Sequence, residues 1–195
     1  LQSSAASDVY KRQVKDESGN TLTVSRKEVD SIVIPNVQNC KHVTVEYRLL
    51  AVDLSVRNNH FDESHLHMMP PFTWFLPTSG IESERMNFKH SIEFKLPKSW
   101  TVTTQLKKTD LIENNGMNIH TYSANNRDDL LDGIAECNSN SLIETTIDGI
   151  RHTLDIWDAG GKEPHPVMLE RFIHDMKRIV KEHHALFGII EEDYH

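Results

Sequence analysis

The stretch that decides the fold class is SLIETTIDGIRHTLDIW, residues 141–157. Two runs rich in β-branched residues flank Asp148-Gly149, and a two-residue Asp-Gly loop is typical of a type I′ turn. The positive φ angles of that turn match the twist of two antiparallel strands. The stretch therefore predicts a β-hairpin, in a chain whose regular structure is mostly antiparallel strands.

The same period of two continues toward the N-terminus. Residues 43–49 and 90–96 alternate between apolar and polar side chains, as a strand with one buried face does. The polar run at 58–70 predicts a loop. Further β-rich runs predict strands at 71–77, 101–104 and 118–124.

The period changes after a Gly- and Pro-rich linker at 161–166. From Pro166 onward, apolar residues recur at three- and four-residue spacing, which predicts an amphipathic helix. Pro166 suits the first helical position and Gly188 suits the C-terminal cap. The predicted fold is therefore mainly β: an antiparallel two-sheet β-sandwich-like domain at 14–160, followed by one amphipathic helix.

Both ends of the sequence look cut. Residues 1–13 have no initiator methionine, no periodicity and a small, polar composition, so we expect a disordered or non-native leader there. At the other end, the helix has no further helix on which to pack its apolar stripe. We expect such a piece to expose apolar surface and sheet edge, and hence to self-associate or be poorly soluble.

Composition excludes several classes of partner. The 21 basic and 29 acidic residues give a net charge of −8, with the two signs interspersed. The lack of a basic stripe argues against nucleic acid or an anionic membrane as a partner. No apolar run reaches the roughly 18–20 residues of a membrane span, and no signal peptide is visible. We expect a soluble protein and leave the compartment open between a bacterial-type cytoplasm and periplasm.

Three histidines on the predicted helix raise the question of a zinc site. His174, His183 and His184 lack the His-Glu-x-x-His spacing that sets two rings one turn apart, and no histidine in the chain is followed by glutamate. At about 100° per residue they point to different sides of the helix. We therefore expect exposed or cap-region histidines, and no zinc ligand among them.

A second group of histidines lies at 60–67. In an extended stretch, His65 and His67 would present their rings on one side. Together with His60 and with Asp62 or Glu63 they could hold zinc or copper. A solvated loop explains the same residues, and no metal ligand is assigned.

The segment NRDDLLDGIAE carries an acidic cluster: Asp128, Asp129, Asp132 and Glu136. Grouped carboxylates can perform acid–base chemistry, bind a cation or hold a substrate amine. A short helix with a solvated acidic face is the alternative. The sequence contains no nucleophile elbow and no phosphate-binding loop, so no catalytic residue is assigned.

Cysteines and tryptophans give weaker signals. Cys40 and Cys137 could pair, but the sequence does not show whether they lie within bonding distance. The tryptophans fall in predicted strands, so we expect them in the core; they are Trp74, Trp100 and Trp157.

Several stretches in fixed order resemble the glycyl-aminopeptidase family of zinc metallopeptidases, in the thermolysin-like clan. These stretches are VTVEYRLLAVDLSVRNNHFDE, FKLPKSWTVTTQL, NRDDLLDGIAE, IRHTLDIWDAGG and HALFGIIEEDYH. The resemblance covers roughly residues 14–195. It implies an N-terminal β domain followed by a mostly helical catalytic domain, of which 167–195 would be the truncated start.

The family resemblance also implies an activity. Its members remove N-terminal residues from peptides, glycine preferentially, with a zinc-activated water. The family's zinc ligands and general base have no counterpart in these 195 residues, so we expect zinc in the parent enzyme and none in this piece, which should be inactive alone. The implied partners are the peptide substrate and the rest of the catalytic domain.

Two carboxylates are carried over as substrate-cleft candidates. Within NRDDLLDGIAE, the part DDLLDGIAE resembles a family stretch reading Asp-x-Leu-Val-Asp-Ser-Pro-Ile-Glu, in which Asp132 and Glu136 match. A carboxylate at the domain junction would attract the substrate ammonium group. Asp132 ranks first and Glu136 second. Between them, Gly133-Ile134-Ala135 replaces Ser-Pro-Ile. Loss of the proline removes a constraint on the local backbone.

Two other functions stay open at the level of sequence. A non-catalytic β-sandwich module would bind peptide or carbohydrate through Trp74 or the His65/His67 segment, and a catalytically inactive family member would act as a scaffold. An in-frame His-Glu-x-x-His downstream favours the enzyme, whereas a stop codon after His195 favours a module.

Overall fold

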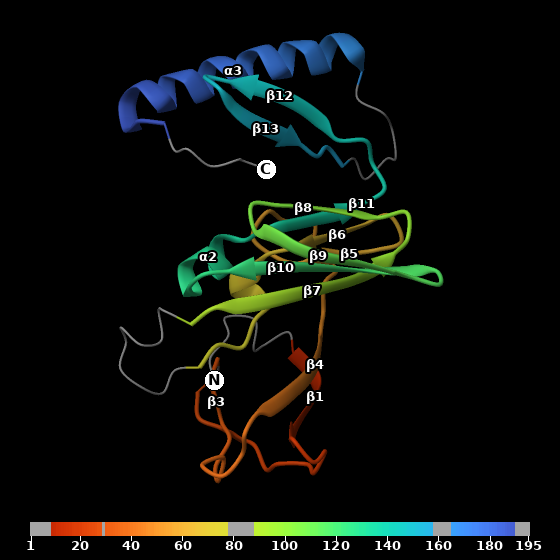
Figure 1. The fold of residues 1–195 in the computed structure, drawn as a ribbon, viewed down its shortest axis with the longest axis vertical. Coiled ribbons are helices and arrows are strands. Elements are labelled where there is room, and N and C mark those ends of the chain that lie inside the picture. Colours follow the sequence, from red (N-terminus) through yellow and green to blue (C-terminus); the bar gives the residue numbers. More distant parts are fainter. Residues whose placement is uncertain (1–8, 29, 78–87, 158–164, 190–195) are drawn as a thin grey trace.

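The structure is a computed structural model that describes residues 9–28, 30–77, 88–157 and 165–189. Figure 1 shows three tiers: a ribbon around β1 and β4 at the bottom, larger sheets in the middle, and a hairpin with the long helix α3 at the top. Every strand pair among the described residues is antiparallel. The mainly β fold with one long C-terminal helix is confirmed.

The elements run as follows. The first six strands are β1 (Val9–Asp16), β2 (Ser25–Arg26), β3 (Ile32–Val33), β4 (Val43–Leu49), β5 (His60–Phe61) and β6 (His65–Met68). A 3₁₀ turn η1 (Pro70–Phe72) precedes β7 (His90–Pro97), β8 (Thr101–Thr104), β9 (Lys107–Asn114) and β10 (Met117–Ala124). The chain ends with α2 (Arg127–Asp132), β11 (Ala135–Asn138), β12 (Ile143–Ile147), β13 (Ile150–Leu154) and α3 (Pro166–Phe187).

The bottom tier corrects the expected leader. Residues 9–13 are the first part of β1, which pairs with β4 in a register that sets Gln13 opposite Glu46 and Val14 opposite Val45. Val14 is buried, with 1% of its surface exposed. The small, polar composition does not predict this strand, because pairing with β4 is what makes the segment extended. Residues 1–8 lie outside the described residues.

The middle tier is formed by two sheets around one core. One sheet has the order β7-β10-β9 and the other the order β5-β6-β11-β8. Ile92, Phe94 and Leu96 alternate inward on β7, as predicted, and join Ala135 and Cys137 of the other sheet in a single buried cluster. The two-sheet sandwich therefore describes this tier, whereas the described chain has five sheets in all.

Three segments differ from the sequence prediction. The expected loop at 58–70 contains β5 and β6, and the expected strand at 71–77 begins with η1. Consecutive prolines fix φ and remove two backbone donors, which favours the 3₁₀ turn over a strand. The strand β9 was not predicted, because all eight of its residues are exposed and carry no apolar alternation. Its pairing with β10 makes it a strand.

The top tier confirms the predicted hairpin and helix. β12 pairs with β13 around Asp148 (φ 50°) and Gly149 (φ 88°), as a type I′ turn requires. Pro166 starts α3, and Gly188, with φ 86°, caps its end. Residues 161–164 of the expected linker lie outside the described part of the chain.

α3 carries two apolar stripes that differ in burial. One is half-buried and consists of Leu169, Ile173, Met176 and Val180, at the spacing of one helix face. The other is exposed and consists of Met168, Phe172, Ile179 and Leu186, each with more than half of its surface accessible. No residue of α3 is buried, so the helix covers little of its apolar surface within the described chain. The expected self-association stays a prediction.

Two remaining features are the state of the cysteines and the character of the helices. Cys40 is half-buried, Cys137 is buried, and both are free thiols. Among the described helices, none has the length and apolar character needed to cross a membrane.

Candidate functional site

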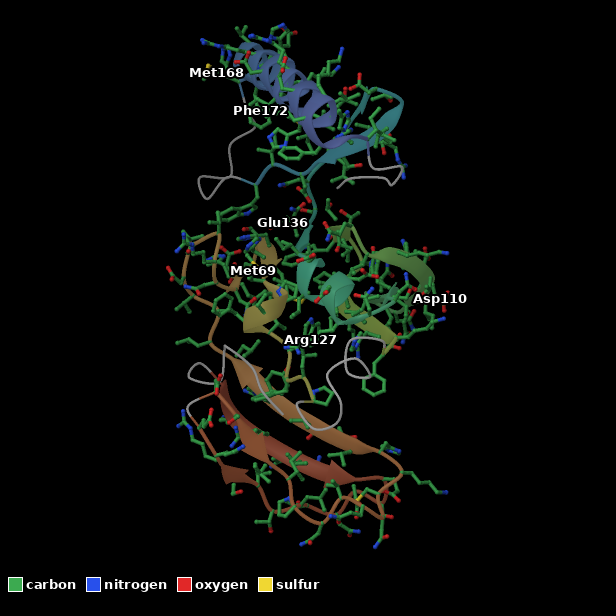
Figure 2. The ribbon with its side chains drawn as sticks, turned by 90° about the vertical axis from the view of Figure 1, so that its left-hand side faces the viewer. Met69, Asp110, Arg127, Glu136, Met168 and Phe172 are labelled. Carbon is green, nitrogen blue, oxygen red and sulfur yellow. The ribbon has the colours of Figure 1, made fainter. Side chains whose placement is uncertain are left out.

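A pocket of about 730 Å³ lies where the four-stranded sheet meets the base of the β12–β13 hairpin. The sheet contributes His65 and His67 of β6, Thr103 of β8 and Glu136 of β11, and the exit of the hairpin contributes Asp155 and Trp157. Figure 2 shows Glu136 in the central part of the molecule, on the side toward the hairpin and α3. The pocket therefore combines two carboxylates, imidazoles and an aromatic wall.

Glu136 is positioned by strand register. β11 runs between β6 and β8, so Glu136 stands opposite His67 on one side and Thr103 on the other. Its Oε2 lies 3.2 Å from Nδ1 of His67, and its Oε1 lies 3.8 Å from Nε2 of His65. With 20% of the side chain exposed, the carboxylate is held by the sheet and still reaches the pocket.

The second substrate-cleft candidate is placed elsewhere. Asp132 is the last residue of α2 and is exposed, and it does not line the pocket. Its main-chain carbonyl accepts a hydrogen bond of 2.7 Å from Nε2 of Gln105. Of the two candidates, Glu136 is the one that the pocket includes.

Asp155 joins the hairpin to the sheet beneath it. Its Oδ2 accepts a 2.8 Å hydrogen bond from Oγ1 of Thr103, and its Oδ1 accepts a 2.9 Å bond from Nδ2 of the fully buried Asn138. Burial raises the pKa of Asp155, the two hydrogen bonds lower it, and the nearby Glu136 carboxylate raises it further. Both carboxylate oxygens already have protein partners.

His65 is the most buried imidazole of the pocket, with 3% exposure. Its ring stacks on Trp157, with ring centroids 3.6 Å apart, and on His60, with centroids 4.8 Å apart. Burial lowers the pKa of His65, although Glu136 and Asp62 act in the opposite direction. The ring is therefore neutral near pH 7 and offers one nitrogen lone pair.

Asp62 shapes the turn between β5 and β6. Its Oδ1 accepts hydrogen bonds from the hydroxyl and the backbone N–H of Ser64, each at 2.7 Å, and from the backbone N–H of His65 at 3.0 Å. These donors hold the pKa of Asp62 well below its usual range. The Ser64 hydroxyl also accepts a 2.9 Å bond from Nε1 of Trp157, which ties the turn to the pocket wall.

Comparison with known proteins identifies the family. Residues 3–133 match the profile of the peptidase M61 N-terminal domain. The chain belongs to the peptidase M61 family. The match covers more than half of the chain and starts at residue 3, so most of the segment expected as a leader belongs to the M61 domain. Glu136 lies just beyond the matched residues.

One solved structure shares the fold of this M61 chain. It is an aminopeptidase N family protein from Idiomarina loihiensis, with a TM-score of 0.73 and 20% sequence identity. The match covers 97% of this chain and 30% of that protein, so the M61 chain spans less than a third of its length. A comparison with curated proteins found no match.

The zinc chemistry implied by the family resemblance does not fit the histidines of α3. His184 approaches Asp148 of the hairpin turn, with its Nδ1 2.9 Å from Oδ2, and His174 lies against its neighbour Asp175. His183 stands beside Phe187 and is exposed. These rings diverge, as the sequence spacing predicts, and no catalytic step is derived through them.

The acidic residues at the start of α2 stabilise the N-terminal end of that helix. The side chain of Asn126 accepts the backbone N–H of Asp129 at 2.8 Å, and Asp129 accepts the backbone N–H of Asn125 in return. These bonds satisfy one free backbone donor of the first turn and the N–H of the residue that precedes the N-cap. Asp128 and Asp129 also lie where the helix dipole favours negative charge.

The tryptophans divide between core and pocket. Trp100 is buried in the core and Trp74 packs against that core, as expected. Trp157 instead forms the aromatic wall of the pocket, against the prediction of core packing. Sequence reasoning also missed Asp155. Neither Trp157 nor Asp155 belongs to a local sequence motif. Both follow β13 at the point where the hairpin meets β8 and β11, so their position depends on tertiary packing.

Proposed function

We propose that this chain is part of a zinc-dependent metallo-aminopeptidase that hydrolyses N-terminal residues, glycine preferentially, from peptides. The match to the M61 N-terminal domain supports a peptidase. The single observation that carries the proposal at the level of the site is Glu136, a partly exposed carboxylate held by strand register at the pocket. An aminopeptidase needs a fixed negative charge that recognises the free ammonium group of its substrate.

Within the pocket, Glu136 suits this role better than Asp155. Both oxygens of Asp155 are hydrogen-bonded to Thr103 and Asn138 at 2.8 and 2.9 Å. Oε1 of Glu136 has only longer contacts, at 3.5 Å from Asn138 and 3.8 Å from His65. It therefore keeps acceptor capacity for a substrate N–H. His67 orients Glu136 through the 3.2 Å contact with Oε2, and Asp155 fastens the wall beside it.

The bond-breaking chemistry belongs to the remainder of the enzyme. When bound there, zinc would supply the activated water. The residues of this chain bind and orient the peptide N-terminus, and they exclude water with Trp157 and the apolar rim at Leu54 and Ile134. In this arrangement the rest of the catalytic domain covers the exposed stripe of α3.

The test uses the full-length parent enzyme with a glycyl peptide as substrate. Glu136→Gln removes the charge with little change of shape, and kcat/KM should fall about 10- to 100-fold because a hydrogen bond to a charged group is lost. Asp132→Asn and the exposed Glu144→Gln are matched controls and should leave kcat/KM unchanged. A chelator should abolish activity in all four proteins.

Three results would contradict this proposal. One is unchanged kcat/KM in Glu136→Gln, which removes Glu136 from substrate recognition. The second is equal cleavage of N-acetylated and free glycyl peptides, since an acetylated peptide has no ammonium group to recognise. The third is activity that survives metal removal, which excludes the zinc-dependent mechanism.

A non-catalytic module that binds peptide or carbohydrate is the second candidate. The observation that favours it is Trp157, whose indole lines the pocket beside imidazoles and carboxylates. Aromatic walls with a few polar groups are typical of ligand pockets. If titration of the 195-residue chain with a glycyl peptide or an oligosaccharide gives saturable binding, and the parent gene encodes no His-Glu-x-x-His, the module replaces the enzyme.

A further inference from the structure

The turn between β5 and β6 brings three potential metal ligands together. His60, Asp62 and His65 each offer a ligand atom, and these atoms lie within 4.8 Å of one another. Nδ1 of His65 lies 3.6 Å from Oδ1 of Asp62. The three residues come from one hairpin, so the grouping is set by local register and not by the docking of distant segments.

Two buried nitrogens of this group have no hydrogen-bond partner. Nδ1 of His60 and Nδ1 of His65 are both shielded from solvent and unpartnered within the described residues. A buried polar atom without a partner destabilises the fold. A bound cation would satisfy both nitrogens at once, because a neutral imidazole binds a metal through its free lone pair.

The surroundings of the group hold it in place. The turn is fixed by three hydrogen bonds to Oδ1 of Asp62, from Ser64 and from the N–H of His65. On its far side, Nε2 of His65 lies 3.8 Å from the carboxylate of Glu136. Metal-bound histidines commonly turn their second nitrogen toward a carboxylate, which orients the ring and raises its basicity.

We propose that His60, Asp62 and His65 bind one divalent transition-metal ion of the zinc class. Two imidazoles and one carboxylate are a donor set that Zn²⁺ favours, whereas Ca²⁺ and Mg²⁺ prefer oxygen ligands throughout. The ion joins β5 to β6 and holds the His65 ring at the wall of the pocket. It is separate from the zinc proposed for the catalytic domain and needs no residue beyond this chain, so the proposal departs from the sequence-based expectation that this piece binds no zinc.

Binding requires a small local rearrangement. Zinc–ligand bonds of about 2.0–2.1 Å place neighbouring ligand atoms roughly 3.4 Å apart, so the separations of up to 4.8 Å must shorten. Asp62 has 43% of its side chain exposed, so it has room to turn toward the rings, but doing so weakens its hydrogen bonds in the turn. The rings of His60 and His65 are stacked at 28°, and they must tilt for both lone pairs to converge. The contact of His65 with Trp157 should change as a result.

The experiment titrates the metal-free 195-residue chain with Zn²⁺ alone by isothermal calorimetry, with tryptophan emission as a second readout. We expect one Zn²⁺ per chain. His60→Gln and Asp62→Asn should each weaken binding about tenfold or more. In Asp62→Asn the amide oxygen can still accept the hydrogen bonds of the turn. A loss of zinc affinity would therefore come from removal of the carboxylate ligand and not from disruption of the turn. Glu136→Gln should weaken binding about 10- to 100-fold, as loss of a carboxylate behind a metal-bound histidine does.

His183→Gln is the matched control, because it removes an exposed histidine of α3 and should leave binding unchanged. Circular dichroism verifies that each variant is folded. Absence of stoichiometric zinc in the wild-type chain would overturn the proposal, as would equal affinity in wild type, His60→Gln and Asp62→Asn. The chain has no His-Glu-x-x-His and the readout needs no peptidase activity, so this site and the proposed function fail independently.

Discussion

The middle and top tiers use apolar residues at regular spacing in the same way but cover them differently. In the middle tier, Ala135 and Cys137 have no exposed surface and Phe94 has 6%. On α3, Phe172 is 52% exposed and Phe187 is 81% exposed, and no residue is buried within the described chain. Periodicity therefore predicts where an apolar stripe lies, but burial depends on a second surface that meets it.

The sharpest test of this comparison truncates one phenylalanine in each tier. Phe94→Ala should lower the free energy of unfolding by about 3–5 kcal/mol, because it leaves a cavity in the closed core. Phe172→Ala should change it by less than about 0.5 kcal/mol, as surface substitutions do. Urea denaturation followed by tryptophan fluorescence measures both. Similar losses in the two variants would show that Phe172 is covered in solution, and light scattering would then test self-association as the cause.

A second test probes how closely the core of the middle tier is packed. A Cβ atom at Gly133 would lie 2.7 Å from the side chain of Leu106, which is itself buried with 7% exposure. Gly133→Ala should therefore destabilise the chain by about 1–3 kcal/mol through overpacking. Asp132→Ala, at the preceding exposed position, is the control and should be near neutral. A neutral Gly133→Ala would mean that Leu106 has room to shift.

A third test addresses a polar residue inside the same tier. His120 is 5% exposed, and neither of its ring nitrogens has a hydrogen-bond partner among the described residues. Burial and, to a smaller extent, Lys108 lower its pKa. Below the ordinary histidine pKa of about 6.5, this imidazole binds a proton in the unfolded chain but stays neutral in the folded chain until a lower pH. Stability should fall as the pH drops below that value.

The variant for this test is His120→Leu. It removes an unsatisfied polar group, so we expect a gain of about 1 kcal/mol at pH 7. We also expect a smaller loss of stability than the wild type between about pH 7 and pH 5. Thermal unfolding at both pH values measures the effect, with the exposed His42→Leu as control. An unchanged pH dependence would show that His120 does not titrate with folding.

The smallest expected effect lies in the top tier. His184 of α3 and Asp148 of the hairpin turn are 2.9 Å apart, with 11% and 31% of their side chains exposed. Asp148→Asn keeps a residue that tolerates the positive φ of the turn but removes the charge. Stability should fall by less than about 1 kcal/mol, as for other partly exposed contacts between polar side chains. A larger loss would identify this contact as the main attachment of α3.

Local chemistry made part of the fold predictable. The Asp148-Gly149 turn, the alternation of β7 and the Pro166 and Gly188 ends of α3 follow from the residues at those positions. The resemblance to a peptidase family brought Glu136 forward, and strand register sets it at the pocket.

Other parts depend on pairing between distant segments. His65 and His67 read as loop residues because histidine is polar, yet pairing of β6 with β11 makes them strand residues. β9 has no apolar alternation and is a strand only through β10. Trp157 and Asp155 reach the pocket because the hairpin docks there. No local pattern in the sequence contains that information.

The attachment of Asp155 has a mechanical consequence. Its hydrogen bonds to Thr103 and Asn138, together with the Trp157–Ser64 bond, fasten the hairpin at its base. The tip at Asp148-Gly149 instead touches α3 through His184. The hairpin is therefore held at its base near Asp155 and contacts α3 at its tip. We expect a displacement of α3 to reach the pocket through Asp155, which lines it.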